Sequence, residues 1–299
     1  MDNEQKIQVM TDIMAKFTSY MGKRLPDDIM NKLRELRQQE DTYLAKVVYD
    51  SMFENQELAD KLDRPCCQDT GVIQYHIKAG AEFPLLANIQ DILRNAVLEA
   101  TRIAPLRHNA VEIFKEKNTG NNTGERVPII DWDIVPDSKS IEIEVYMAGG
   151  GCSLPGQGKT LMPSVGYEGI VEYVFDVMTS MGLNACPPLL VGIGIAGSIE
   201  VAARLSKKAL FRPIGSRHND PRGAEMELLI EKGLNEVGLG PQGLSGKNSV
   251  TAVHIESAAR HPSTISVAIN VGCWAHRRGT IRINEDMSYE IISHKGVTL

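Results

Sequence analysis

Three cysteines of this sequence lie where a thiolate could bind a metal centre. Cys67, Cys186 and Cys273 each stand beside glycine or proline at the ends of expected elements, rather than on apolar faces. Free backbone N–H groups in such segments can hydrogen-bond to the sulfur atoms of a cluster. The three cysteines are far apart in the chain and none of them forms a C-x-x-C pair, so only the fold could bring them together. The pattern is compatible with an iron–sulfur centre, with a structural zinc site and with ordinary buried thiols.

Arginine and histidine recur together in loop-like segments flanked by glycine or proline. One such pair is typical of a solvated surface, but several in an acidic protein favour an anionic substrate. Arginine binds carboxylates through its planar fork of N–H groups. The pairs are Arg107-His108, Arg217-His218 and Arg260-His261, and residues 276–278 form a similar basic group.

A glycine-rich stretch, residues 148–160, ends like a nucleotide-binding P-loop. The P-loop spacing fails, because Ser153 occupies the position of the required first glycine, and Pro155 lies within the stretch. We therefore expect Lys159 to be a surface charge rather than a phosphate ligand. The run of three glycines would instead let backbone N–H groups approach a carboxylate, because no side chain blocks them.

The elements that must position these residues fall into two parts. Apolar residues recur at helical spacing through about residue 62, which predicts a helical N-terminal lobe. Strands and helices then alternate, so we predict a mixed α/β fold in which residues 1–299 form one domain. The expected strands are 72–77, 141–146, 189–195, 250–255, 264–270 and 280–283, the last pairing with 288–293, and the expected helices after the lobe are 87–104, 167–181, 198–209 and 224–237.

Composition and charge narrow the function classes. The chain has 299 residues, of which 42% are hydrophobic and 23% charged, and these values are typical of a soluble globular protein. Its formal net charge of −6 argues against nucleic acid as the main partner. The N-terminus lacks the pattern of a secretory signal, and the most apolar run is far too short for a membrane span. We therefore expect a cytoplasmic protein that binds neither nucleic acid nor membrane.

Several long motifs, taken in order, resemble the α subunits of the class I, iron–sulfur-dependent fumarase and tartrate dehydratase family. The resemblance covers essentially the whole chain from about residue 25. The motifs are RPCCQDTG (64–71), APLRHNAVEIF (104–114), GGGCSLPG (149–156), NACPP (184–188), RPIGSRH (212–218) and HIESAARHPSTISVAINVGCWAHRRG (254–279).

This resemblance implies a cofactor and its ligands. Cys67, Cys186 and Cys273 match the positions that hold a 4Fe-4S cluster, in which one iron has no protein ligand. Cys66 and Cys152 do not fall at ligand positions and are expected to be structural. Cys66, which adjoins Cys67, is the one departure from the family pattern at these positions.

The resemblance also implies a substrate site. Gln68, Asp69, Arg107 and Gly150 match positions that line this site in the family. Removal of water from a 2-hydroxy acid needs a base for the proton on the adjacent carbon, and Asp69 is our candidate, with positioning of another group as the alternative. Arg107 would bind a substrate carboxylate.

The expected activity is that of the α subunit of a hydro-lyase acting on a four-carbon dicarboxylate. L-Tartrate to oxaloacetate is the first choice, and interconversion of malate and fumarate is the alternative. A non-catalytic iron–sulfur scaffold or sensor would use the same cysteines, and a structural zinc protein is a third possibility. The resemblance places further substrate-binding residues on a β subunit, so we expect a hetero-oligomer of two α and two β chains.

Overall fold

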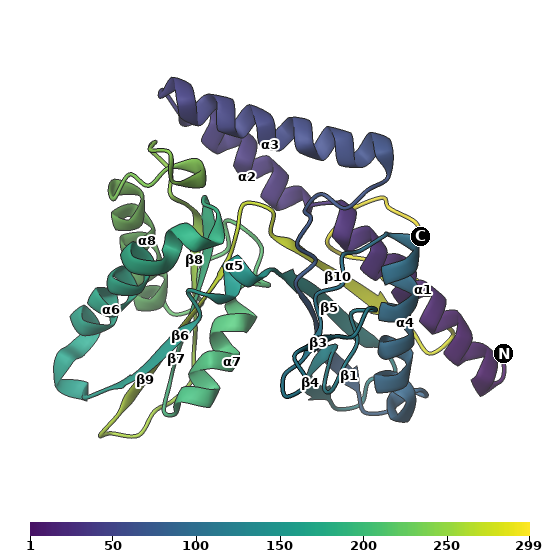
Figure 1. Ribbon diagram of the computed structural model, residues 1–299. Coiled ribbons are helices and arrows are strands. Elements are labelled where there is room, and N and C mark those ends of the chain that lie inside the picture. The colour runs from purple at the N-terminus through teal and green to yellow at the C-terminus, as the bar shows by residue number, and fades with distance from the viewer. The chain divides into compact units, whose positions relative to one another are not determined.

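The computed structural model describes all residues 1–299, and Figure 1 shows its helices and strands. Helices hold 43% of the residues and strands 23%, which confirms the predicted mixed α/β class. The chain forms two compact units. The first contains Met1–Asp27, Asn55–Gly149 and Arg277–Leu299, and the second contains Asp28–Glu54 and Gly150–His276.

The first unit is built on a five-stranded sheet with the order β11-β10-β5-β1-β4. β1 pairs with β4 in parallel, and the other neighbours are antiparallel. The pairing of β10 with β11 confirms the predicted hairpin near the C-terminus. The strands are β1 (Val72–Gly80), β4 (Ile129–Val135), β5 (Ile141–Ala148), β10 (Arg277–Ile283) and β11 (Tyr289–Ile291).

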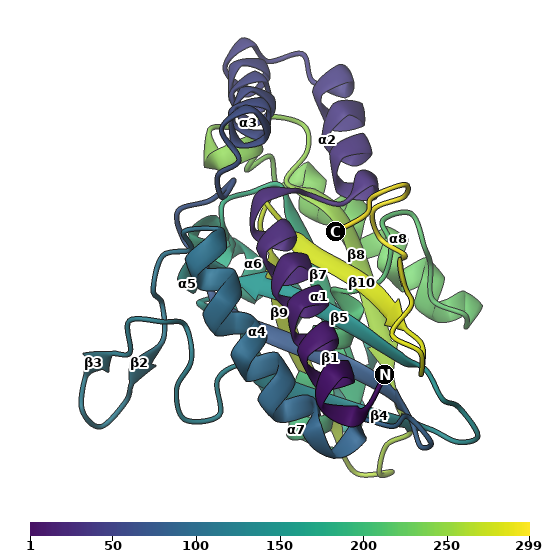
Figure 2. The same ribbon diagram turned by 90° about the vertical axis from the view of Figure 1, so that its right-hand side faces the viewer.

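Two helices cover one face of this sheet. α1 (Asn3–Lys23) and α4 (Ile89–Ile103), the latter preceded by a 3₁₀ turn (Leu86–Asn88), lie side by side against it (Figure 2). The apolar face follows from the alternation of strand residues, because Ile73, Tyr75 and Ile77 join the same buried core as both helices. The residues between them point to the other face, where the ring of His76 lies 2.8 Å from a carboxylate oxygen of Asp131.

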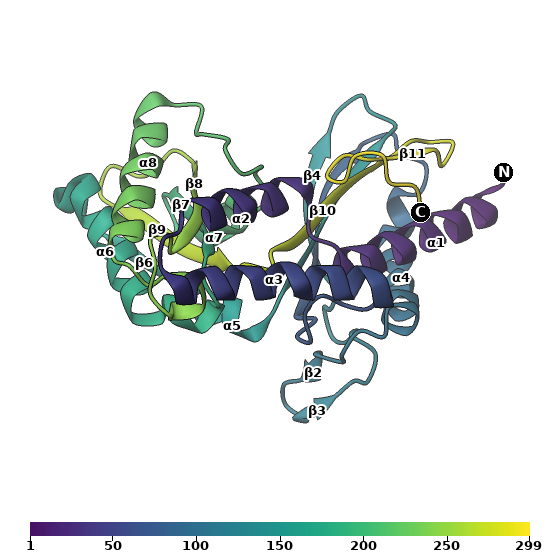
Figure 3. The same cartoon turned by 90° about the horizontal axis from the view of Figure 1, so that it is seen from above.

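A small hairpin, β2 (Val111–Glu112) and β3 (Lys117–Asn118), projects from the rest of the first unit (Figures 2 and 3). Its tip carries Ile113 and Phe114, which are almost wholly exposed. The segment that leads into it contains Arg107, so the hairpin adjoins a residue predicted to bind substrate.

The second unit has a four-stranded sheet with the order β6-β9-β7-β8. β7 runs parallel to β8 and antiparallel to β9, and β6 pairs antiparallel with β9. The strands are β6 (Gln157–Leu161), β7 (Leu189–Ala196), β8 (Val250–Ser257) and β9 (Ile265–Gly272).

The sequence of β7 explains how helices pack on both faces of this sheet. Its larger residues, such as Val191 and Ile193, share a core with α6 (Gly166–Met181) and α8 (Pro221–Glu236). On the opposite face Gly194 lies so close to α7 (Ile199–Ala209) that a side chain would collide with the helix backbone. Close approach of a helix to a sheet requires glycine at such a position.

The remaining helices are short or lie near the N-terminus. α2 (Asp27–Gln39) and α3 (Tyr43–Leu62) join α1 in making the first 62 residues helical, as predicted, and both units contain residues of this segment. None of the helices is both long and apolar enough to cross a membrane. The short elements are α5 (Gly150–Ser153) and three 3₁₀ turns, η2 (Pro163–Val165), η3 (Gly182–Ala185) and η4 (Pro241–Gly243).

Four strands were absent from the prediction, namely the two short hairpin strands β2 and β3 and the longer strands β4 and β6. β4 has an irregular burial pattern that period-two alternation does not reveal. β6 is a mostly exposed strand of polar sequence, and its backbone pairing with β9 determines its conformation. Lys159 lies on β6, with its ammonium 5.9 Å from the centre of the Tyr173 ring. It is therefore an exposed strand residue, and the P-loop interpretation is excluded.

Candidate functional site

Each unit contains part of the predicted site. Cys67, Gln68, Asp69 and Arg107 belong to the first unit, and Gly150, Cys186 and Cys273 belong to the second.

In the first unit, a loop between α3 and β1 carries the two adjacent cysteines. The backbone N–H of Cys66 donates to the Gly22 carbonyl at 3.1 Å, and its carbonyl accepts from the Asn55 side chain at 2.8 Å. The Cys66 side chain is 5% exposed. Burial raises the pKa of its thiol to about 11, an effect that the nearby Arg277 partly offsets. Cys66 thus stays a neutral thiol near pH 7, whereas Cys67 is half-buried.

Asp69 is held by contacts to both its backbone and its carboxylate. Its carbonyl accepts a 2.6 Å hydrogen bond from the guanidinium of Arg277, a residue that is itself buried. Its Oδ1 accepts from the backbone N–H of Gly71 at 3.0 Å and from the side-chain amide of Asn109. Its Oδ2 faces Gly149, where any side chain would collide with the carboxylate. The carboxylate is therefore confined to one orientation.

The two other predicted residues of this unit are more open. Gln68 and Arg107 are both exposed. Arg107 lies in the segment between α4 and β2, two residues before Asn109. An exposed guanidinium in this place can bind a carboxylate that arrives from solvent.

In the second unit, Cys186 and Cys273 lie at the same edge of the sheet. Cys186 ends η3 three residues before β7 begins, and Cys273 follows the last residue of β9. Because β7 and β9 are antiparallel, the start of one strand adjoins the end of the other. The backbone N–H of Trp274 donates to the Cys186 carbonyl at 3.2 Å, so the two cysteine segments are in direct contact.

The backbone exposes Cys186 at this edge. Cys186 has a left-handed conformation with φ of 55°, and its side chain is exposed. Cys273 is half-buried and Cys152 is buried. Of the three cysteines in this unit, only Cys152 is thus buried.

The glycine-rich segment packs beside Cys186. It forms the single helical turn α5, which contacts η3 and β9. A side chain at Gly151 would collide with the Asn184 carbonyl, two residues before Cys186. Gly150 is exposed. The lack of side chains thus allows α5 to lie directly against the cysteine segment.

A half-buried cation lies close to α5. Burial lowers the pKa of Lys207, in the last turn of α7, to about 8, and the neighbouring Cys152 acts in the opposite direction. The residue after this helix, Leu210, accepts a 2.9 Å hydrogen bond at its carbonyl from the buried ring of His276. This contact ties the end of α7 to the segment that follows Cys273.

The other basic pairs make contacts within their own units. Arg217 donates to Glu231 at 2.8 Å, and Arg260 donates to the His261 carbonyl at 3.0 Å. His218 accepts a 3.0 Å hydrogen bond from the backbone N–H of Asp220. These contacts account for much of the repeated arginine–histidine pattern without a substrate. Sequence reasoning missed Asn109 as a functional candidate, although this residue directly follows the Arg107-His108 pair.

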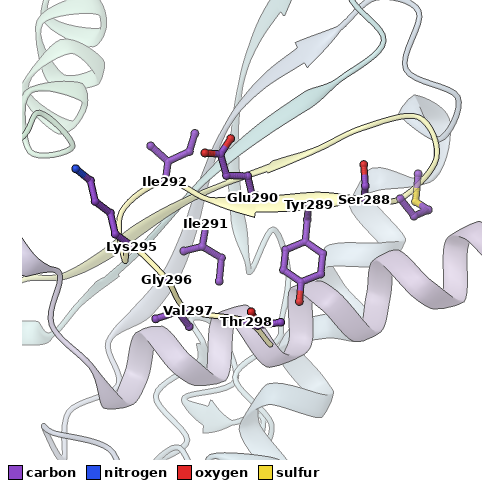
Figure 4. Close-up of a pocket in the computed structure, with 10 residues that line it drawn as sticks. Ser288, Tyr289, Glu290, Ile291, Ile292, Lys295, Gly296, Val297 and Thr298 are labelled. Carbon is purple, nitrogen blue, oxygen red and sulfur yellow. The ribbon is translucent and has the colours of Figure 1, made fainter.

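A hollow of the first unit lies away from these residues. It has a volume of about 730 Å³, and β11 and the C-terminal tail form its lining (Figure 4). The Tyr289 hydroxyl accepts a 3.0 Å hydrogen bond from the backbone N–H of Leu299, so the tail folds back on this strand. The hollow contains none of the predicted site residues.

Comparison with known proteins agrees with the resemblance seen in the motifs. Residues 11–282 match the family model described as fumarate hydratase (Fumerase). The chain is 57% identical over 293 residues to the L(+)-tartrate dehydratase subunit alpha of Escherichia coli strain K12, and to that of Shigella boydii. Each alignment covers 98% of this chain and 97% of the relative.

A more distant relative extends this similarity. A protein of Methanocaldococcus jannaschii is 34% identical over 280 residues, which cover 93% of this chain and 98% of the relative. The predicted family is confirmed: the chain belongs to the fumarate hydratase (Fumerase) family.

Proposed function

We propose that this protein is the α subunit of an iron–sulfur hydro-lyase that dehydrates L(+)-tartrate to oxaloacetate and water. The observation that carries the proposal is the 57% identity, over 98% of the chain, to subunits named for tartrate dehydratase. Similarity of this extent includes every segment that bears a predicted site residue.

The proposed cofactor is a 4Fe-4S cluster held by Cys67, Cys186 and Cys273. The donor set suits this group, because Cys186 is exposed and the other two are half-buried. The thiol of Cys66 is buried and has a raised pKa, which suits it for packing instead. When bound, the cluster would supply an iron without a protein ligand, able to act as a Lewis acid on a substrate oxygen.

The other residues have separate proposed roles. Asp69 takes the proton from the carbon next to the departing hydroxyl, because its carboxylate is held in one orientation. Arg107 binds a substrate carboxylate through its exposed guanidinium. Gln68 and Gly150 line the site, with Gly150 offering its backbone. Loss of one water from tartrate leaves an enol, which rearranges to oxaloacetate.

The remaining substrate contacts are proposed to come from a β subunit in a cytoplasmic assembly of two α and two β chains. The names of the relatives, which include the word "alpha", support a second kind of chain. We expect no contact with nucleic acid or membrane.

Interconversion of malate and fumarate is the second candidate, and the description of the matching family model favours it. The substrates differ by one hydroxyl group. The deciding experiment is anaerobic assay of the reconstituted α and β chains with L-tartrate and with malate. We expect a higher kcat/KM for L-tartrate, and a higher value for malate would establish the second candidate.

Two non-catalytic alternatives have distinct signatures. An iron–sulfur scaffold or sensor would bind the cluster without turning over either dicarboxylate, and a zinc protein would lack the broad visible absorption of a cluster. A hydro-lyase with an open iron should lose activity in air and regain it with iron and reductant. Activity that is stable in air and indifferent to iron chelators would contradict the proposed cofactor.

A further inference from the structure

Asn109 links the core of the first unit to the carboxylate of Asp69. Its backbone N–H donates at 2.7 Å to the side-chain oxygen of Asn122, a buried residue. The amide of Asn122 in turn donates at 3.2 Å to the hydroxyl of Thr101 in α4. The backbone of Asn109 is thus anchored to a packed helix, and this anchoring fixes the position from which its side chain extends.

From this position the Asn109 amide donates to Oδ1 of Asp69. The same oxygen accepts from the backbone N–H of Gly71 at 3.0 Å. Two donors on one oxygen define the plane of the carboxylate. They also turn Oδ2 towards Gly149, the residue before Gly150.

We propose that Asn109 is a positioning residue that orients the Asp69 carboxylate for proton transfer. This inference rests on the proposed function, in which Asp69 moves a substrate proton. A misplacement of about 1 Å at a reacting group can reduce the rate about a hundredfold. A neutral amide suits the task, because it can hold the carboxylate without neutralising its charge.

A purely structural role would have other consequences. The segment around Asn109 is also held by the Asn118 side chain, which donates to the His108 carbonyl at 2.7 Å, and by the N–H of Thr119, which donates to the Ala110 carbonyl at 2.9 Å. If Asn109 only supported the hairpin, its loss would lower stability and change substrate affinity together. A positioning role predicts a fall in kcat at nearly constant KM.

The test compares Asn109→Ala with Asn109→Gln in the cluster-loaded complex of α and β chains. We expect Asn109→Ala to lower kcat about tenfold to a hundredfold, with KM within about twofold of wild type, as for an interaction made in the transition state. Iron and sulfide content should be unchanged. The substrate deuterium isotope effect on kcat should rise, because proton removal becomes slower. Asn109→Gln, which retains the donor, should recover part of the rate.

Asn118→Ala is the matched control, since it removes another amide from the same segment. It should leave kcat unchanged. An unchanged kcat and isotope effect in Asn109→Ala would overturn the inference. So would a loss of rate that merely follows a loss of bound iron.

A double-mutant cycle with Asp69→Asn shows whether Asn109 acts through Asp69. The double variant should be no slower than Asp69→Asn alone, whereas additive losses would overturn the inference. If wild-type enzyme turned over neither tartrate nor malate, the proposed function would fail. In that case the free energy of unfolding is measured for the wild type, the two single variants and the double variant. Non-additive changes in this free energy would support the coupling between Asn109 and Asp69, and additive changes would overturn it.

Discussion

The loop that carries Cys67 and the sheet edge that carries Cys186 and Cys273 are held by different kinds of contact. One backbone hydrogen bond holds the loop at Cys66, but most of its contacts come from side chains, because Asn55 and Arg277 donate to its carbonyl groups and Asn109 donates to Asp69. Backbone pairing of β7 with β9 creates the edge, and a backbone hydrogen bond joins its two cysteine segments.

The two regions should therefore differ in their sensitivity to amino-acid substitution. We expect that replacing a single side chain can disorder the loop. The sheet edge should keep its conformation after a side-chain substitution, unless the substitution alters the backbone or removes a thiol. This difference also matches the proposed roles. The loop and its neighbours hold the groups proposed to move a proton and to bind a carboxylate, and the edge carries two of the proposed cluster thiols.

The cysteine substitutions should have the strongest consequences, because the proposed cluster ligands belong to both regions. Cys67→Ser, Cys186→Ser and Cys273→Ser should each abolish cluster loading, since all three thiolates are needed in the proposed ligand set. Cys66→Ser and Cys152→Ser are the matched controls and should retain it. Iron and sulfide analysis after anaerobic reconstitution measures how much cluster each variant binds. Normal loading in the Cys186 variant would contradict the ligand assignment.

Arg107→Ala should affect substrate binding and leave the cluster intact. A hydrogen bond to a charged group contributes about 1.5–3 kcal/mol, so KM should rise about tenfold to a hundredfold. Arg102→Ala is the control, because Arg102 is also exposed and pairs only locally with Glu99. Steady-state kinetics of the complex decide the matter, and an unchanged KM would remove Arg107 from the site.

Gly151→Ala tests the backbone-built edge. The added methyl group would collide with the Asn184 carbonyl and displace the segment that carries Cys186. Overpacking of this kind costs about 1–3 kcal/mol of stability, and we expect weaker retention of iron as well. Chemical denaturation and iron analysis test both effects. A variant as stable as wild type would show that α5 can move away from η3 freely.

The mildest change is expected at Lys207, where the substitution should affect only the stability of the chain. Because burial lowers its pKa to about 8 from an ordinary value of 10.5, the folded state binds this proton more weakly than the unfolded chain. The charge therefore lowers stability below pH 8, and this penalty disappears between pH 8 and 10.5. Lys207→Met should therefore stabilise the cluster-free chain by about 1–3 kcal/mol at pH 7, the upper value corresponding to the whole pKa shift.

Urea unfolding at pH 7 and at pH 9.5 measures the free energy of unfolding of the wild type and of the methionine variant. The extra stability of the variant should decrease at the higher pH. Lys208→Met, one residue further along α7, serves as the control. If the difference in free energy of unfolding between the Lys207→Met variant and the wild type did not depend on pH, the lysine charge would not be its cause.

Much of the architecture could be predicted from the sequence, because the spacing of apolar residues differs between helices and strands. The amphipathic α1 and the alternating β5 are of this kind, and so is the hairpin of β10 and β11. β6 could not be found this way, since partner strands rather than its own polar residues determine its conformation. The cysteines at the sheet edge were recognisable as candidates from their glycine and proline neighbours.

The contacts that hold Asp69 could not be predicted, because they join residues far apart in the chain. Arg277 lies 208 positions from Asp69 in the chain, and Asn109 lies 40 positions from it, in the segment after α4. No local pattern marks such pairs. The burial that separates Cys66 from Cys67 is likewise a property of the fold and not of the two adjacent letters.

The central claim is that this chain supplies the cluster ligands and part of the substrate site, and that a second chain completes it. The most direct test is anaerobic assay of the cluster-loaded α chain with L-tartrate, first alone and then after addition of the β chain. We predict a loaded α chain that forms no oxaloacetate alone and becomes active when the β chain is added. Full dehydration of tartrate by the α chain alone would contradict this account.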